Sequence, residues 1–433
     1  MTLFVLIARA DHPIPKVIRK FTVDLESGNS FAKIRSDSEM SSPTKINAAL
    51  ELDSHLNQYN MSECVLKFDH FENIHRLENA LISKDSPNFR KVNGFPVFGT
   101  GQPTVVAFKE AVTYVRDVLG METILWTNMR QEPVVYANGL SFTPREASRL
   151  NENMEFPGIT GPELEKLQEE FVEVLRRRAS SGEVDEGKVR YYKDTYAEHP
   201  ADRKNIEYIV PLDDDKALKT LSMVYDELKH EGFHLTYVRL PIVDEKAPNE
   251  GDFDLLVSAL KGEPKETACF FNCQMGKGRT TTGMIIACLI KRVLYDTGLD
   301  ETSAIISASA GEQSFDVISK LIEAVPAAKE AKVLLDSIID LCGEPPVGTG
   351  LQNLRHCILW TKEKYDAEPD HKKPFWKHMG VNFIERYFYL VCFATYVLEQ
   401  KETLFATTFS EWMGTHTDLR DLIKSGMSEF QWV

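Results

Sequence analysis

The residues with the clearest chemical potential lie in one short stretch, residues 271–280, which reads FNCQMGKGRT. Cys273 and Arg279 are separated by five residues, and two of these are glycines. Glycines let the backbone curl so that successive N–H groups point inward and bind an anion. Arg279 offers a planar fork for two oxygens of a phosphate. The spacing therefore predicts a phosphate-binding loop, whose substrate-contacting residues are Gln274, Met275, Gly276, Lys277 and Gly278.

Cys273 is the predicted nucleophile of this loop. The inward N–H groups, the positive end of a helix expected from about Thr280, and Arg279 all favour the thiolate form of its side chain. A thiolate beneath a bound phosphate can attack in line and form a phosphocysteine intermediate. The hydroxyl of Thr280 can then donate to the sulfur and help it to depart. The alternative is a buried structural cysteine in a plain turn. The buried strand before the loop and the apolar helix after it favour catalysis.

A departing alkoxide or phenoxide needs a proton, so a general acid is expected on a nearby loop. Residues 239–248 (RLPIVDEKAP) place Asp244 at the end of a predicted strand, between prolines that can fix a lid. Glu245 and Asp252 are competing candidates. Asp252 is better explained as a helix cap, so Asp244 is the predicted acid.

Two further cations are candidate substrate-binding residues. Lys277 lies inside the loop, where it is either a solvated lysine on an exposed turn or a second cation that favours substrates with several phosphates. Arg130 ends a predicted strand at the sheet edge where such sites form. It could contact substrate, brace the loop, or form a structural ion pair with Glu132.

Two other patterns suggest different chemistry and are not favoured. His230 and His234 match the zinc-protease pattern H-E-x-x-H, but Gly232 ends the helix that both histidines would have to share. Cys269, four residues before Cys273, is interpreted as a packed core thiol rather than as a redox partner. The sequence predicts no metal and no cofactor.

The elements around these residues alternate between strands and helices. Strands are predicted over residues 123–128, 234–242 and 268–271. Helices are predicted over 104–119, from 143, over 162–179 and 216–230, from Asp252 to about 261, and after Arg279. This order indicates an α/β fold with a largely parallel central sheet flanked by helices. Beyond about residue 310 the pattern is helical throughout, which predicts a C-terminal all-helical extension.

The amino-acid composition limits the class of protein to which the chain can belong. The 433 residues are 43% hydrophobic and 27% charged, as in an ordinary globular chain, and the net charge is −15. Such an acidic surface argues against nucleic acid as a partner and requires a local basic patch for any peripheral contact with a membrane. The longest apolar runs are too short to span a bilayer. Seven irregularly spaced cysteines are typical of a reducing compartment, so the cytosol is the expected location.

Several ordered motifs resemble the paladin-type repeats, which are related to the bacterial protein-tyrosine-phosphatase-like phytases. They include NFR at 88–90, PVFGTGQP at 96–103, NMRQEPV at 128–134, residues 237–248 with DFD at 252–254, and the loop at 272–283. ERYFYL at 385–390 and FSEW at 409–412 extend the resemblance into the helical tail. It covers about residues 86–415, the length of one repeat.

The resemblance implies a cysteine-dependent phosphatase fold and a metal-free phosphomonoesterase. Its implied substrates are phosphorylated inositols, phosphoinositides or phosphotyrosine, hence a phosphorylated small molecule, a lipid headgroup or a phosphoprotein as partner. The predicted organisation has three parts: a segment 1–85 of unknown role, a phosphatase domain 86–310 and a helical extension 311–433. The segment 1–85 is interpreted as a remnant of another repeat or as the edge of a larger protein. Asn272 stands where the phytases have histidine. A catalytically weak or inactive phosphate-binding scaffold is therefore the alternative function.

Overall fold

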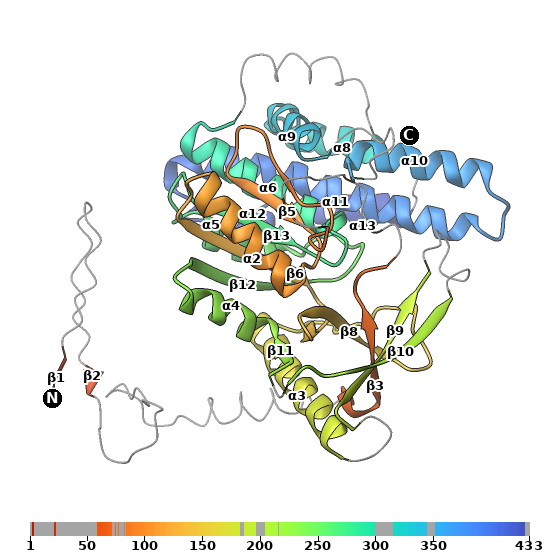
Figure 1. The fold of residues 1–433 in the computed structure, drawn as a ribbon. Helices are drawn as coiled ribbons and strands as arrows, with labels where there is room; N and C mark the ends of the chain where they lie inside the picture. The colour runs from red at the N-terminus through yellow and green to blue at the C-terminus, as the bar shows by residue number, and fades with distance from the viewer. Residues whose placement is uncertain are drawn as a thin grey trace. The chain divides into compact units, whose positions relative to one another are not determined.

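The computed structural model describes residues 2–3, 21–22 and 59–428, with gaps at 72–73, 75–76, 78–81, 83, 182–185, 196–203, 215, 299–314 and 344–350 (Figure 1). The chain divides into two units, residues 1–59 and 60–433. Within the first unit, the described strands β1 (Thr2–Leu3) and β2 (Phe21–Thr22) pair antiparallel. Most of the segment 1–85 therefore lies outside the described residues. From Asn60 onward the chain belongs to the second unit.

A five-stranded sheet forms the centre of this second unit. Its order is β12 (His234–Ile242), β6 (Thr123–Arg130), β13 (Ala268–Asn272), β5 (Val97–Thr100) and β4 (Arg90–Lys91). The first four strands run parallel, and only β4 is antiparallel to its neighbour. All five residues of β13 are buried, as expected for a strand covered on both faces. The largely parallel central sheet is confirmed.

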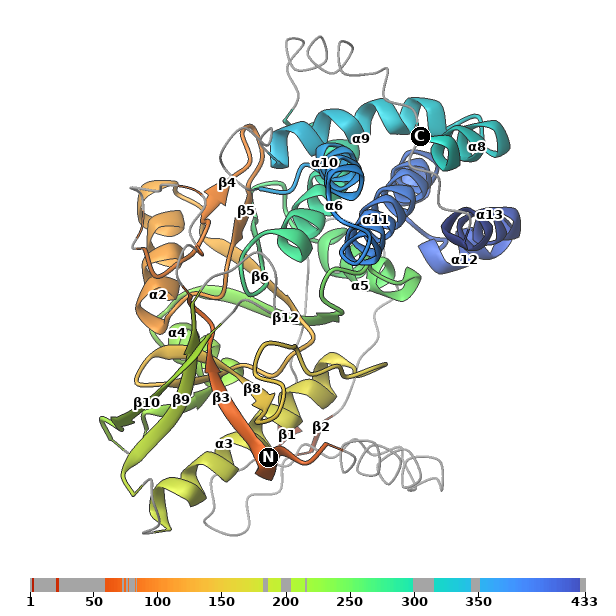
Figure 2. The same cartoon turned by 90° about the vertical axis from the view of Figure 1, so that its right-hand side faces the viewer.

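Helices cover both faces of the five-stranded sheet (Figure 2). On one face lie α2 (Val105–Thr113) and α4 (Leu221–His230), which share a core cluster with Trp126 and Phe270. On the other face lie α5 (Glu250–Leu260) and α6 (Gly278–Tyr295). A π-helical turn, Tyr114–Val118, follows α2. Asn249, not Asp252, is the N-cap of α5; Asp252 completes a capping box with it from the third helical position.

A second sheet of six strands was not expected from the sequence. Its order is β10 (Asn205–Pro211), β9 (Lys188–Asp194), β3 (Cys64–Phe68), β8 (Leu140–Glu146), β7 (Val135–Ala137) and β11 (Leu218–Thr220). All its pairs are antiparallel except β3 with β9. The predicted helix start at Thr143 is wrong, because Thr143–Glu146 pairs with β3 as strand β8. Helix α3 (Gly161–Ser180) packs against this sheet and β12, and it carries the predicted amphipathic pattern.

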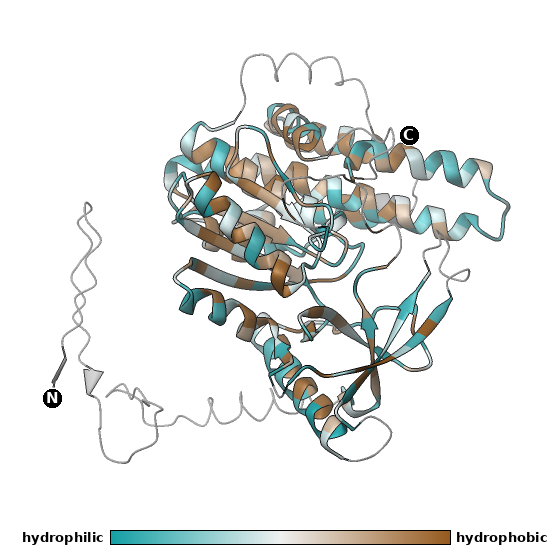
Figure 3. Cartoon of the chain, in the orientation of Figure 1, coloured by the Kyte–Doolittle hydropathy of each residue, from teal (hydrophilic) through white to brown (hydrophobic). Residues whose placement is uncertain are grey.

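The all-helical extension is confirmed. It comprises α8 (Asp316–Ala324), α9 (Ala328–Cys342), α10 (Leu354–Ala367), α11 (Lys373–Gln400), α12 (Phe409–Thr415) and α13 (Thr417–Ser428). Much of α11 is buried, and it shares one core cluster with α5, α6 and the sheet. The central strands are largely hydrophobic, whereas hydrophilic residues interrupt the ribbon of β9 and β10 (Figure 3). Among the described helices, none is both long and apolar enough to cross a bilayer.

Candidate active site

The predicted phosphate-binding loop connects β13 to α6 at the carboxyl edge of the parallel sheet. Asn272 ends the strand and Gly278 begins the helix. Gly276 has a φ of +75°, and a Cβ there would lie 2.4 Å from the backbone N of Gly101. A glycine is therefore required at this point of the loop for both conformation and space.

Two side chains and one backbone N–H hold the loop through its carbonyl groups. Asn88 Nδ2 donates to the carbonyl of Met275 (2.7 Å), and Arg90 Nη1 donates to that of Gly276 (2.8 Å). The backbone N–H of Gln102 donates to the carbonyl of Gln274 (2.9 Å). Holding successive carbonyls in this way leaves the neighbouring N–H groups for an anion. The sequence analysis quoted these residues only as part of a resemblance and gave them no role.

Cys273 lies at the base of the loop with 4% of its surface exposed. The Thr280 Oγ1 lies 3.2 Å from the Cys273 Sγ and also 3.2 Å from the carbonyl oxygen of Thr100. The structure thus brings the predicted nucleophile and the predicted hydroxyl donor together. The single hydroxyl proton has two acceptors within reach.

Arg279 is almost fully buried and is fixed by Glu132. Its Nη1 lies 3.2 and 3.1 Å from the two carboxylate oxygens of Glu132 and donates to the carbonyl of Ile242 (3.1 Å). Burial alone would raise the pKa of Glu132, but the charges of Arg279 and Arg130 lower it to about 2. Glu132 is thus a charged anchor for the predicted phosphate clamp. The sequence suggested it only as a partner for Arg130.

Arg130 does not reach the loop. Its guanidinium is fully buried and bonds to both oxygens of Asp69 (2.7 and 3.0 Å), to the hydroxyl of Thr143 (2.8 Å) and to Glu132 (3.4 Å). Of the roles considered for Arg130, the geometry supports the ion pair and the bracing of the loop through Glu132. It does not place the side chain where a substrate could touch it.

Asp244 lies beside the clamp, on the segment between β12 and α5. Its Oδ1 is 3.2 Å from the Arg279 Nε, and 43% of its side chain is exposed. Asn153 Nδ2 donates to the other carboxylate oxygen (3.0 Å), and Asn153 is itself bonded by Arg145. Glu245 adopts a φ of +64°, an unusual backbone conformation for a residue with a side chain. The structure therefore joins Asp244, Arg279 and the loop.

The two competing acids are placed differently. Glu245 follows Asp244, and burial with the nearby Asp244 charge raises its pKa. Asp252 lies in the first turn of α5, and burial raises its pKa to about 6 despite its hydrogen bonds with Asn249. The two hydrogen bonds between Asp252 and Asn249 give Asp252 a structural role at the start of α5.

Lys277 is half-buried between the loop and the helical extension. Burial raises the pKa of the Cys357 thiol of α10 to about 11, and the Lys277 charge opposes that shift. The charge of Lys277 thus acts on a residue of the helical extension, and both roles considered for this lysine stay predictions.

Asn272 belongs to a buried amide network behind the nucleophile. Its Oδ1 accepts from the indole N–H of Trp126 (2.8 Å), and its Nδ2 donates to the Gln102 Oε1 (3.0 Å). Asn128 donates to the same oxygen (3.1 Å). These neutral groups fix the end of β13, but they add no charge beside the sulfur.

The two patterns that the sequence analysis did not favour lie apart from this chemistry. His230 ends α4 and His234 begins β12, so the two histidines do not share a helix face. Across the part of the chain that the structure describes, no group of three or more His, Cys, Asp or Glu side chains is placed to hold a metal ion. Cys269 is fully buried, and burial raises the pKa of its thiol to about 11.

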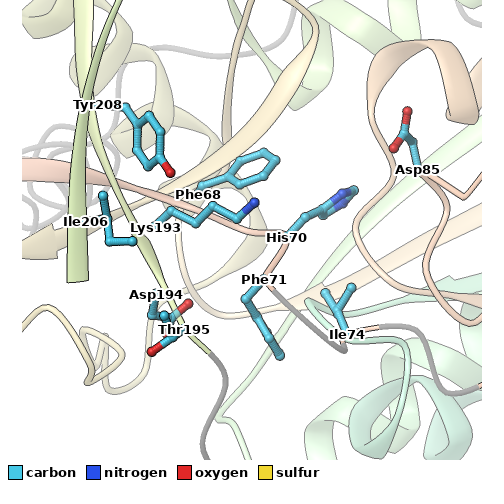
Figure 4. A pocket seen from close by; sticks show the side chains of 10 residues that line it. All are labelled: Phe68, His70, Phe71, Ile74, Asp85, Lys193, Asp194, Thr195, Ile206 and Tyr208. Carbon is cyan, nitrogen blue, oxygen red and sulfur yellow. The ribbon is translucent and has the colours of Figure 1, made fainter. Parts of the chain in front are cut away.

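A pocket of about 480 Å³ lies between the β9–β10 ribbon and the residues that follow β3, and none of its lining residues belongs to the loop (Figure 4). Figure 4 shows the ammonium of Lys193 between Phe68 and His70. The His70 Nε2 donates to the carbonyl of Gln102 (2.7 Å), and the Gln274 side chain donates to the carbonyl of Asp69 (3.4 Å). The pocket is therefore connected to the Gln274 side of the loop through two backbone contacts.

The sheet, the loop and the helical extension define the class of fold, a cysteine-dependent phosphatase fold. The sequence model of the protein-tyrosine-phosphatase-like phytases, described as inositol hexakisphosphate, matches residues 127–291. Two solved structures each have a TM-score of 0.51 and cover 82% of this chain and 48% of their own. They are the tandemly repeated phytase of Mitsuokella multacida (17% identical) and its myo-inositol phosphatase in complex with myo-inositol-(1,3,4,5)-tetrakisphosphate (16% identical).

Among curated proteins, the chain is similar to paladins. It is 29% identical to paladin from Xenopus tropicalis over 79% of its length, 29% identical to that of Gallus gallus over 75%, and 25% identical to that of Homo sapiens over 76%. The predicted resemblance to paladin-type repeats is confirmed. The chain spans 38%, 36% and 35% of the length of these three relatives, well under half.

Proposed function

We propose that this protein is a cysteine-dependent phosphomonoesterase that acts through a phosphocysteine intermediate. The observation that carries the proposal is the arrangement of three groups. The Cys273 sulfur lies within 3.2 Å of the Thr280 hydroxyl, and Arg279 is fixed beside it by Glu132. Asp244 lies 3.2 Å from the same arginine. These are the groups needed for attack, charge stabilisation and proton donation.

The proposed reaction has two steps. The Cys273 thiolate attacks phosphorus in line, a P–S bond forms and the P–O ester bond breaks, while Asp244 transfers a proton to the leaving oxygen. Arg279 binds two of the remaining oxygens. Water then attacks phosphorus while the Asp244 carboxylate accepts its proton, the P–S bond breaks, and a hydrogen bond from Thr280 stabilises the departing thiolate. Because Asp244 and Arg279 are paired here, phosphate binding must compete with this carboxylate for the guanidinium.

The proposed substrates are phosphorylated inositols or phosphoinositides, with phosphotyrosine as the other class. The family description and the inositol tetrakisphosphate complex of a structural relative support the first class. The pocket lined by His70 and Lys193 has room for part of a substrate, and Asp69, next to His70 in sequence, accepts a hydrogen bond from Gln274 of the loop. A release assay across inositol phosphates, phosphoinositides and a phosphotyrosine peptide separates the classes.

The mechanism is tested by two substitutions. Cys273→Ser should abolish phosphate release while phosphate binding survives. Asp244→Asn should slow hydrolysis of esters with poor leaving groups by roughly 10²- to 10⁴-fold and affect good leaving groups much less. An equal loss on both kinds of ester would remove Asp244 from the acid role. Release that persists in the Cys273→Ser variant would remove the phosphocysteine route.

The alternative function is an inactive phosphate-binding scaffold. The neutral surroundings of Asn272 favour it, since its amide is engaged by Trp126 and Gln102 and supplies no charge to the sulfur. A scaffold would bind a phospholigand but release no phosphate above the Cys273→Ser control. The pH dependence of Cys273 alkylation separates the two, because a nucleophile must react as a thiolate near neutral pH.

The proposed location is the cytosol. All seven cysteines are free thiols, as a reducing compartment allows. A lipid headgroup or a phosphoprotein as substrate carrier, and peripheral contact with a membrane, belong to the same proposal. Binding to vesicles with and without phosphoinositides tests the membrane contact.

A further inference from the structure

Arg386 of α11 is the one residue of the ERYFYL motif that reaches the candidate active site. Only 1% of its surface is exposed, although it belongs to the helical extension and lies more than one hundred positions after the loop in sequence. The mechanism above gives this side chain no part. Its contacts connect α11 with both of the segments that carry the reaction.

The first connection is to the start of α6, where the loop ends. Arg386 Nη1 donates to the Gln352 Oε1 (3.2 Å). A Cβ on Gly278 would lie 2.9 Å from that oxygen and 3.3 Å from Arg386 Nη1. The backbone of Gly278 therefore packs directly against this pair, one residue before the phosphate clamp Arg279.

The second connection is to the segment that carries Asp244. Arg386 Nη2 donates to the carbonyl of Lys246 (3.3 Å), two residues after the acid. Asn382, one turn earlier on α11, accepts from the Lys246 ammonium (3.2 Å). Two residues of α11 thus hold this segment, in which Glu245 has the unusual φ of +64°.

The charge of Arg386 is not neutralised by a direct ion pair. Within the described residues no carboxylate forms a salt bridge with it; its Nε has no hydrogen-bond partner, as is also true of the Arg355 Nε. Burial lowers the pKa of Arg386, while the more distant charge of Asp244 opposes that shift. A buried cation that contacts no opposite charge destabilises a fold. A role in stabilising the helical extension therefore does not by itself explain why Arg386 is buried here.

Arg355 on α10 shows what a structural arginine of the same extension looks like. It is 2% exposed, and its guanidinium pairs with Asp336 (3.6 Å) and with Asp340. Among the described residues no hydrogen bond or ion pair connects it with the loop or with the segment of Asp244. Arg355 is therefore a matched control, similarly buried but not bonded to either segment.

We infer that Arg386 is a positioning residue of the candidate active site, through which the helical extension fixes the spacing between the phosphate loop and the acid-bearing segment. The inference rests on the proposed function. It assigns to the extension a part in catalysis, because misplacing a reacting group by about 1 Å can cost roughly 10²-fold in rate.

The test compares Arg386→Met, Arg386→Lys and Arg355→Met in the full chain. With an ester of a poor leaving group, Arg386→Met should reduce kcat by roughly 10- to 100-fold, with a smaller change in KM. With an aryl phosphate of good leaving group, where protonation matters less, the loss should be several-fold smaller. Arg386→Lys keeps the charge but not the fork, so its loss should approach that of Arg386→Met.

Thermal unfolding separates positioning from stability. Arg355→Met should lower the melting temperature while leaving kcat and the leaving-group dependence of the wild type unchanged. The inference is overturned if Arg386→Met and Arg355→Met lose activity only in proportion to folded protein, or if Arg386→Met affects both kinds of ester equally.

A binding readout keeps this inference distinct from the proposed function. Vanadate should protect Cys273 from iodoacetate in the wild type and in Arg355→Met, and at least several-fold less effectively in Arg386→Met. A wild type that is protected but shows no turnover contradicts the phosphatase proposal and still tests the loop contact of Arg386. Equal protection in all three proteins contradicts that contact.

Discussion

Two regions of the molecule bury arginines among carboxylates, and they do so with different outcomes. At the edge of the five-stranded sheet, Glu132 lies between Arg130 and Arg279. In the helical extension, Arg355 lies between Asp336 and Asp340. Both terminal nitrogens of Arg355 are paired, whereas the Nη2 of Arg279 makes no hydrogen bond with the described residues. In the first region one terminal nitrogen of Arg279 is therefore left without a partner, whereas in the second both terminal nitrogens of Arg355 face carboxylates and its Nε has no hydrogen-bond partner among the described residues.

The comparison teaches that burial of an ion pair does not by itself indicate a site. Anchoring through Nη1 and Nε fixes the plane of the Arg279 guanidinium and leaves Nη2 as a donor for a ligand. The guanidinium of Arg130 bonds to the buried side chains of Asp69, Thr143 and Glu132, so Arg130 belongs with Arg355 in this respect. The two regions differ in which guanidinium nitrogens remain without a partner.

Removing the charge of Glu132 should have the largest effect. In Glu132→Gln, Arg279 and Arg130 lose the carboxylate that they share, which should cost about 3–5 kcal/mol of unfolding free energy. Affinity for vanadate should fall as well, because Arg279 is no longer fixed. Urea unfolding and vanadate titration measure the two losses. If the variant lost stability but bound vanadate normally, Glu132 would resemble the acids around Arg355.

The same carboxylate should make the protein sensitive to acid. The pKa of Glu132 is held near 2 in the folded protein, against 4.5 for the ordinary group. Its stabilising contribution is therefore complete above about pH 4.5 and is lost as the pH falls towards about 2. Unfolding free energy measured across this window should decline more steeply in the wild type than in Glu132→Gln. Parallel curves would show that Glu132 does not carry this dependence.

Asp336→Asn tests the other region. Asp336 accepts from the Tyr387 hydroxyl (2.7 Å) and pairs with Lys332 (2.7 Å) as well as Arg355. Loss of its charge should lower the unfolding free energy by about 1–3 kcal/mol, since Asp340 still neutralises Arg355. Vanadate affinity should remain unchanged. A clear loss of affinity would show that the extension's ion pairs also shape the loop.

Asn153→Ala should have the smallest effect, and it tests how far Asp244 depends on its hydrogen bond with Asn153. It removes the hydrogen bond to the Asp244 Oδ2, worth about 0.5–1.5 kcal/mol or roughly a 2- to 10-fold change in rate. We expect that loss in kcat for poor leaving groups only. Hydrolysis of a good leaving group serves as the internal control, and an equal loss with both would assign Asn153 a general structural role.

The sequence predicted the central sheet and the loop because their signals are local. Residues 268–271 are apolar, the whole of β13 is buried, and the glycines and the helix follow at once. Three pairs of the six-stranded sheet, β3 with β8, β3 with β9 and β7 with β11, are distant in sequence and carry no local signal. The partners in β3 and β8, for example, are 74 to 82 positions apart. The pairs β7–β8 and β9–β10 are local, and the sequence analysis missed them. The T-P-R-E spacing at Thr143 predicted a helix start, yet pairing with β3 prevailed over that local preference.

The candidate site was predicted in part for the same reason. Cys273, Arg279 and Thr280 lie within one stretch, so their proximity follows from the loop. Glu132, Asn153 and Arg386 reach it from other elements, and their spacing in sequence carries no sign of it. The available signal was that Glu132 and Arg386 lie in NMRQEPV and ERYFYL, two motifs of the resemblance; Asn153 lies in none of those motifs.

The hydroxyl proton of Thr280 has two acceptors, and it thereby links the end of β5 to Cys273. A hydroxyl can serve the Thr100 carbonyl or the sulfur, but not both fully at once. When the sulfur carries negative charge it attracts the proton, and the last carbonyl of β5 is left without that donor. When the charge is quenched by a bond to phosphorus, the proton can return. In the proposed reaction, the orientation of the Thr280 hydroxyl would therefore follow the charge of the Cys273 sulfur.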